Sequence, residues 1–228
     1  MFIGHFGVGF AAKAVAPRTS LGTLFLAAQF IDLLWPMFLL LGIERVRIDP
    51  HASAATPLDF VHYPFSHSLA TVLGWALLIG GGYYAIRRYP RGAAVAAALV
   101  VSHWLLDAIV HPSDLPLYPG SEVFVGLGLW SSLIGTLAFE LAIFAVGVSL
   151  YLKSTRALKG RDFVLGLLIA VLLLIYVGNL FGSPPPNVMA IAWVGEAQWL
   201  LVLWGYWADR RRVPASGELL QPGWSGNV

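Results

Sequence analysis

Six long apolar segments constrain the fold of this 228-residue chain more than any other feature. Each approaches the roughly 20 residues that a helix needs to cross the hydrocarbon core of a bilayer. Only 11% of the residues are charged, whereas soluble domains carry about 25%. This shortage of charge argues against a soluble globular enzyme and against a disordered chain. The segments are 21–43, 65–86, 92–110, 123–152, 163–182 and 188–208.

We therefore expect an all-α fold, a polytopic transmembrane helical bundle with six full spans and a short helix within residues 2–17. Lys13 and the lack of a small-residue cleavage site distinguish this first helix from a signal peptide. The helical domain is expected to cover residues 1–212, and the Gly- and Pro-containing segment 213–228 to form a flexible tail. The connection 44–64 is long, polar and proline-containing, which is compatible with an ordered loop.

The basic residues predict the orientation. If seven helices alternate, only Arg45 and Arg47 of the 14 Lys and Arg residues fall on one side. Short cytoplasmic loops retain basic residues, so we expect the C-terminus in the cytoplasm and the N-terminus outside a bacterial inner membrane. This distribution explains the basic character of the chain without a nucleic-acid partner. The expected surroundings are a lipid bilayer.

Ionisable side chains occur repeatedly within or beside the apolar segments, where each costs at least about 2.5–3.5 kcal/mol at mid-span. His103 and Asp107 are four residues apart, so both project from one face of a helix. Such spacing lets a helix offer two ligands to one metal ion. The candidate metal ligands are His5, Asp32, His62, His67, His103 and Asp107. Asp107 and the deeply placed Glu140 are the candidate catalytic residues, Glu140 to orient or protonate the substrate.

Imidazole and carboxylate ligands without thiolates suit Zn²⁺, Mn²⁺ or Fe²⁺. The candidate set is too large for one tetrahedral site, and we expect one to three divalent ions, with zinc favoured. Paired ions about 3.5–4 Å apart clamp both oxygens of a phosphoester in hydrolysis. His111, Glu196, Arg45 and Arg47 have no assigned role, although the two arginines are the only basic groups on the expected side of the site.

Four segments resemble a family of bacterial membrane-bound metal-dependent hydrolases, once described only as a domain of unknown function. Gly4-His5 resembles the family's early His, and Phe30-Ile31-Asp32-Leu33-Leu34 resembles its Pro-Asp-x-Asp element. His62-Tyr63-Pro64-Phe65-Ser66-His67-Ser68 resembles its His-Arg-Gly-Phe-Thr-His-Ser motif, and His103-Trp104-Leu105-Leu106-Asp107 its His-x-x-x-Asp helix.

This resemblance covers roughly residues 4–112, and it departs from the family pattern at Phe30, Leu33 and His111. It implies a membrane hydrolase with a metal centre built from the matching His and Asp residues. The order of these residues is also distantly similar to that of the zinc phospholipase C and P1 nuclease class. In that class such residues bind a zinc cluster that hydrolyses phosphodiesters.

The function expected from these observations is hydrolysis of a phosphoester or other ester of an amphiphilic, lipid-like substrate, at a site open to the non-cytoplasmic side. An alternative is a divalent-cation or proton transporter that uses the same His and Asp groups. A metal-stabilised scaffold for partner proteins is a third possibility. The substrate, the metal and the oligomeric state stay open at this stage.

Overall fold

Helices dominate the computed structural model, which describes residues 1–158 and 163–215. Six are long and apolar enough to cross a membrane, counting α8 and α9 as one span. The helices are α1 (Ile3–Val15), α2 (Leu21–Leu40), α3 (Pro64–His67), α4 (Leu69–Arg87), α5 (Pro90–Val110), η1 (Leu129–Ser131), α6 (Leu133–Ser154), α7 (Phe163–Phe181), α8 (Val188–Glu196) and α9 (Gln198–Asp209). The expected all-α bundle with a short first helix is confirmed.

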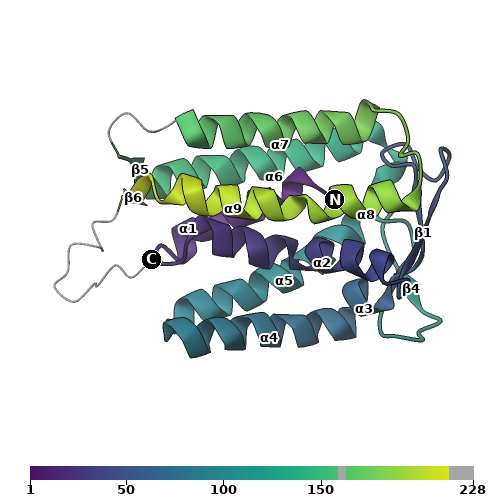
Figure 1. The fold of residues 1–228 in the computed structure, drawn as a ribbon, viewed down its shortest axis with the longest axis horizontal. Helices are drawn as coiled ribbons and strands as arrows, with labels where there is room; N and C mark the ends of the chain where they lie inside the picture. Colours follow the sequence, from purple (N-terminus) through teal and green to yellow (C-terminus); the bar gives the residue numbers. More distant parts are fainter. Residues whose placement is uncertain (159–162, 216–228) are drawn as a thin grey trace.

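Three short antiparallel strand pairs lie at the two ends of the bundle (Figure 1). At one end, β1 (Arg45–Ile48) pairs with β2 (Leu58–His62), and β3 (Leu115–Pro116) pairs with β4 (Phe124–Val125). At the opposite end, β5 (Thr155–Ala157) pairs with β6 (Arg212–Pro214). The expected domain boundary at residue 212 therefore falls within β6, and residues 216–228 of the expected tail lie outside the described residues.

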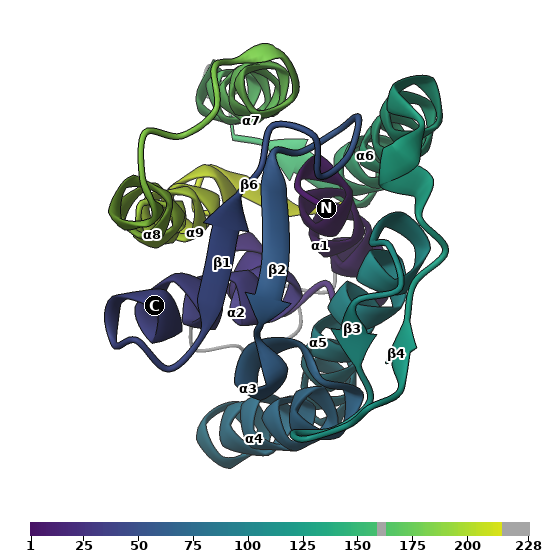
Figure 2. The same cartoon turned by 90° about the vertical axis from the view of Figure 1, so that its right-hand side faces the viewer.

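The two N-terminal helices lie near the centre of the bundle, as Figure 2 shows in the end-on view. Helix α2 has the largest buried share among the six candidate spans. Helix α1 packs so closely on α6 that a Cβ added to Gly147 would lie 1.9 Å from the carbonyl oxygen of Gly7. Small residues permit such close helix contacts in membranes. The first helix is therefore part of the core, and its first residues begin midway along the bundle (Figure 1).

Three of the expected segments are broken in the structure. The segment 65–86 divides at Ser68, whose hydroxyl accepts a hydrogen bond from the Thr71 amide and caps α4. The segment 123–152 becomes α-helical only at Leu133. Strand β4, Gly128 with a φ of 72° and the short 3₁₀ helix η1 come first. Glycine adopts such a left-handed conformation without a steric cost. The segment 188–208 divides at Ala197 into α8 and α9.

Basic residues of the described chain gather at the bundle end that carries β5 and β6 (Figure 1). Lys13 lies in the last turn of α1, Arg87 ends α4 and Lys153 lies in the last turn of α6. Lys159 and Arg161 lie outside the described residues. The helices indicate a membrane protein, and the direction in which it crosses the bilayer stays a prediction.

Candidate metal centre

Four helices bring five of the six predicted ligands into one cluster near the middle of the bundle. His5 comes from α1, Asp32 from α2, His67 from α3, and His103 and Asp107 from α5. The side chains are buried apart from that of Asp32, which is 19% exposed. Within residues 1–158 and 163–215, two overlapping groups could hold a metal ion: His5, His103 and Asp107, and Asp32, His67 and His103.

The nitrogen and oxygen atoms of Asp32, His67, His103 and Asp107 approach one another in pairs at distances close to those between ligands of one metal ion. His103 Nε2 lies 3.1 Å from Asp107 Oδ2 and 3.6 Å from Asp32 Oδ1. His67 Nε2 lies 3.5 Å from Asp32 Oδ1 and 3.8 Å from Asp107 Oδ2. Ligands bonded to zinc at about 2.0–2.2 Å in a tetrahedron lie about 3.4 Å apart. The spacings around His103 and His67 are therefore compatible with metal ligation, in two overlapping groups of three residues that share His103.

The hydrogen bonds of His103 determine where its proton lies. Nδ1 is 2.7 Å from the carbonyl oxygen of Ala28, which can only accept a hydrogen bond. Nδ1 must therefore carry a proton, and the neutral ring has its lone pair on Nε2. This Nε2 is buried and has no hydrogen-bond partner in the described part of the chain, although two carboxylates lie beside it. A cation between Nε2 and the carboxylates would resolve this arrangement.

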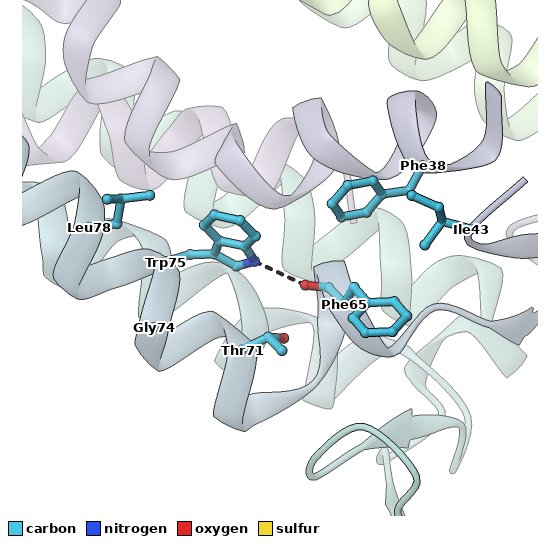
Figure 3. A pocket seen from close by; sticks show the side chains of 7 residues that line it. All are labelled: Phe38, Ile43, Phe65, Thr71, Gly74, Trp75 and Leu78. Carbon is cyan, nitrogen blue, oxygen red and sulfur yellow. Dashed lines mark hydrogen bonds between the residues drawn. The ribbon is translucent and has the colours of Figure 1, made fainter. Parts of the chain in front are cut away.

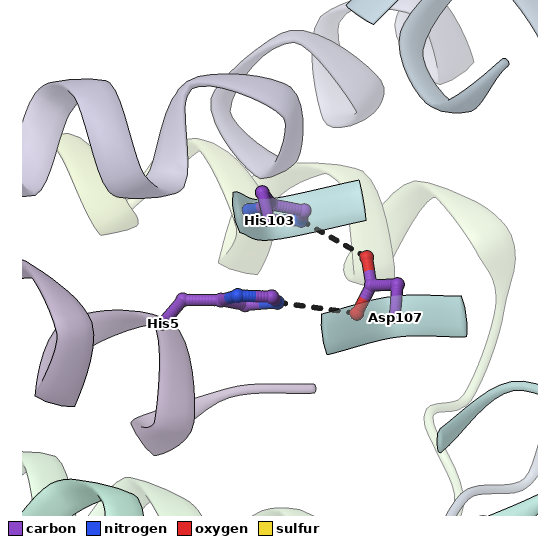
Figure 4. Close-up of side chains that lie close together, drawn as sticks. All are labelled: His5, His103 and Asp107. Carbon is purple, nitrogen blue, oxygen red and sulfur yellow. Dashed lines mark hydrogen bonds and ion pairs between the residues drawn. The ribbon is translucent and has the colours of Figure 1, made fainter. Parts of the chain in front are cut away.

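Asp107 presents its two oxygens to different neighbours (Figure 4). Oδ2 is near His103 and His67, whereas Oδ1 lies 3.2 Å from His5 Nε2 and 2.6 Å from the Met1 nitrogen. The His5 and His103 rings are stacked with their centroids 3.6 Å apart. His5 Nδ1 is buried without a hydrogen-bond partner among the described residues. Asp107 could thus bridge two ions, one beside His67 and one beside His5.

His62 is not brought into the cluster. It is exposed at the end of β2 and lines an outer pocket of about 280 Å³. Tyr63 and Asp114 line the same pocket. The Tyr63 hydroxyl donates to Asp114 at 2.7 Å, and burial together with the Asp114 charge raises the pKa of Tyr63 above its ordinary value. The hydroxyl therefore remains a donor.

Glu140 lies beside the cluster but outside both candidate metal-binding groups. Its Oε2 accepts hydrogen bonds from the backbone amides of Phe2 at 2.9 Å and Gly4 at 3.2 Å. Amides in the first turn of a helix have no partner within the helix. In the structure Glu140 thus binds the start of α1, and this contact holds the helix that carries His5.

Arg47 and His111, at the bundle end that carries β1 and β2, have local partners. Arg47 Nε donates to Asp59 Oδ2 at 3.0 Å in an exposed ion pair between β1 and β2. His111 Nδ1 lies 3.1 Å from Asp114 Oδ1, and its ring packs on Trp130 with the centroids 4.1 Å apart. Burial lowers the pKa of His111 below its ordinary value.

The sequence did not single out Ser66 and Tyr63, which contact His67, or Glu44, which contacts Ser66. Glu44 begins the polar connection after α2, yet it is buried and accepts a hydrogen bond from the Ser66 hydroxyl at 2.6 Å. The Tyr63 ring centroid is 5.1 Å from that of His67. Ser66 could have been found from its position beside His67, whereas the separation of 22 positions between Glu44 and Ser66 gives no spacing signal.

Together, the fold and the cluster define a polytopic helical membrane protein with a buried His/Asp group that could hold a metal ion. In comparisons with known proteins, no family model, no curated protein and no solved structure matches this chain.

Proposed function

We propose that this protein is a membrane-embedded metal-dependent hydrolase that acts on a phosphoester or other ester of an amphiphilic substrate. The observation that carries the proposal is the convergence of His67 and His103 on the carboxylates of Asp32 and Asp107, at 3.1–3.8 Å. The Nε2 atom of His103, which lies beside two carboxylates and has no hydrogen-bond partner among the described residues, supports a cation at this place. Imidazole and carboxylate ligands favour zinc, with manganese and iron as alternatives.

A divalent ion in such a centre supplies a water of lowered pKa and polarises an ester oxygen. The chain contributes the arrangement around it. Asp107 is held by neighbours on both of its oxygens, and the Ala28 carbonyl fixes the ring of His103. Asp32, with its partly exposed side chain, lies where a substrate and water reach the cluster. Glu140 holds the start of α1 and thereby positions His5.

An apolar groove lined in part by Phe65, two residues before His67 in the chain, supports a lipid-like substrate. It has a volume of about 710 Å³ and opens between α2, α3 and α4 (Figure 3). Trp75 Nε1 donates to the carbonyl oxygen of Phe65 at 2.9 Å. This hydrogen bond joins two residues of the groove wall, and Phe65 precedes His67 by two residues in the chain. Because α2 and α4 are candidate membrane spans, the occupant we assign to the groove is the hydrocarbon chain of the substrate. The ester would then lie towards His67.

The competing transporter function needs a polar path from the cluster to the opposite end of the bundle. Lys13 and Asp209 form a buried ion pair at that end, with 2.7 Å between Nζ and Oδ2. Buried aromatic rings lie between this pair and His5. The centroids of neighbouring rings in this group are 4.8–6.0 Å apart. They are Phe6, Phe10, Phe25 and Phe144. This barrier favours a cavity open at one end, and hence a hydrolase over a transporter.

Metal content and ester hydrolysis of the detergent-purified protein test the proposal together. The wild type should carry one to three equivalents of zinc, manganese or iron and hydrolyse a lipid phosphoester. His103→Ala and Asp107→Ala should lose most of the metal and at least about 100-fold in turnover, since each removes a ligand. Mass spectrometry of metals and a phosphate-release assay provide the readouts.

His62→Ala is the matched control, because it also removes an imidazole but from an exposed position. It should retain the metal and the activity. Full hydrolysis in the folded His103→Ala and Asp107→Ala variants would overturn the proposal. Metal-dependent ion flux in proteoliposomes without hydrolysis would favour the transporter instead, and tight metal binding with neither activity would favour a scaffold.

A further inference from the structure

Glu44 makes an unusual set of contacts for a residue in a connection between helices. It is 2% exposed, and Oε1 accepts hydrogen bonds at 2.8 Å from the backbone amides of both Phe65 and Ser66. Its other oxygen, Oε2, accepts a hydrogen bond at 2.6 Å from the Ser66 hydroxyl. The side chain of Tyr63, which precedes α3, makes no capping bond. Glu44 therefore caps α3 from a distant part of the chain.

The chain of contacts continues from Ser66 to His67. Ser66 Oγ lies 2.7 Å from His67 Nδ1. A hydroxyl has one proton to donate, and Ser66 donates it to the carboxylate of Glu44. Nδ1 of His67 must then be the donor to Ser66 Oγ. The neutral His67 ring consequently has its lone pair on Nε2, the atom that lies 3.5 Å from Asp32 Oδ1.

We propose that Glu44 is a positioning residue, which acts through Ser66 to hold His67 in the tautomer that presents Nε2 to the metal ion. The proposal rests on the metal centre of the proposed function and adds to it a residue outside the ligand set. Ligating histidines commonly donate their second ring nitrogen to a partner that fixes the ring. Here a serine hydroxyl relays the effect of a buried carboxylate.

The Glu44 carboxylate sets the direction of the Ser66 hydroxyl because it has no proton to donate, and its negative charge matters less for this effect. In a Glu44→Gln variant, the side-chain oxygen of the glutamine can still accept hydrogen bonds from the two backbone amides. Its side-chain NH₂ group then faces Ser66 Oγ. The amide donates to Ser66, which frees the hydroxyl proton to turn towards His67 Nδ1. The His67 proton then moves to Nε2, and the lone pair no longer faces the cluster.

Titration with Zn²⁺ or Co²⁺ against a competing chelator tests this in the full-length protein. Glu44→Gln and Ser66→Ala should each weaken metal binding by about 10–100-fold, the usual effect of losing such a partner. Ser66→Thr, which retains the hydroxyl, should bind like the wild type. Asp59→Asn is the matched control, because it also converts a carboxylate to an amide at the same end but in an exposed ion pair.

Nitrogen-15 NMR of histidine-labelled metal-free protein gives a readout that a purely structural role would not move. The His67 signals should report a protonated Nδ1 in the wild type and a protonated Nε2 in Glu44→Gln. Ser66→Ala leaves both backbone bonds to Glu44 in place, so it tests the relay even if Glu44→Gln fails to fold. Unchanged metal affinity and an unchanged tautomer in the folded variants would overturn this inference. A wild type that binds no metal would instead overturn the proposed function.

Discussion

His111 is buried beside the outer pocket without belonging to the candidate metal centre. The groups that face it are the Asp114 carboxylate, the Tyr63 hydroxyl and the ring of Trp130. Burial holds its pKa below the ordinary value of about 6.5. The folded protein therefore keeps His111 neutral at a pH where the unfolded chain already binds a proton.

This difference in His111 protonation between the folded and unfolded chain predicts that the free energy of unfolding depends on pH. Because the folded pKa is lowered, the contribution of His111 is fully present above pH of about 6.5 and is lost as the pH falls below it. The melting temperature of the wild type in detergent should fall more steeply from pH 7 to pH 5 than that of His111→Phe. Phenylalanine retains the packing on Trp130 but cannot bind a proton. Equal slopes of melting temperature against pH for the two proteins would contradict the lowered pKa of His111.

At the level of residues, the sequence was most informative where one helix carries two groups. The four-residue spacing of His103 and Asp107 predicts a shared helical face, and the structure has these side chains 3.1 Å apart. Glu44 could not be found in this way, because its contact with Ser66 depends on how the chain returns after the β1–β2 hairpin. Glu140 was noticed as a deep acid, but its contact with the start of α1 required the packing of α6.

At the level of elements, α4 offers a direct test of the apolar groove. Gly74 lines the groove, and a Cβ added there meets no atom within 4 Å. Gly74→Phe should therefore fill the groove without disturbing α4. Burial of a methylene is worth about 0.8 kcal/mol, so excluding two methylenes should raise KM for a long-chain ester about 15-fold. A short-chain, water-soluble ester should be hydrolysed as by the wild type.

The control for this variant lies on the same helix. Gly81 also has open space around its added Cβ and does not line the groove, so Gly81→Phe should leave KM for both esters unchanged. An equal loss with long and short esters in Gly74→Phe would mean that the groove does not hold the chain. Steady-state kinetics in mixed micelles distinguishes these results.

The helices themselves were largely predictable, whereas their interruptions were not. Apolar segments of about 20 residues report length and burial in lipid, and six such helices are present. Hydropathy averaged over about 20 residues does not register the break at Ser68, because the long apolar sequence of α4 that follows dominates the average. That break separates α3 from α4 and allows His67 to turn towards α2 and α5.

For the molecule as a whole, the open prediction is its direction in the membrane. The described ends of α1, α4, α6 and α9 carry the basic residues on the side of β5 and β6. The hairpin β1–β2 lies at the other end (Figure 1), and Phe60, Val61 and His62 of β2 line the exposed pocket there. Retention of basic residues in the cytoplasm predicts that this hairpin and the pocket that β2 lines face outward.

The chain contains no cysteine, so single substitutions give unique thiols for labelling. Ala54→Cys introduces an exposed thiol between β1 and β2, and Leu158→Cys one beside β5, where the side chain is 39% exposed. A membrane-impermeant maleimide should label Ala54→Cys in intact spheroplasts and Leu158→Cys only after the membrane is opened. The reverse pattern would place the β1–β2 hairpin in the cytoplasm. The proposed hydrolase would then act on lipids of the inner leaflet, and the chain would be an exception to the basic-residue rule.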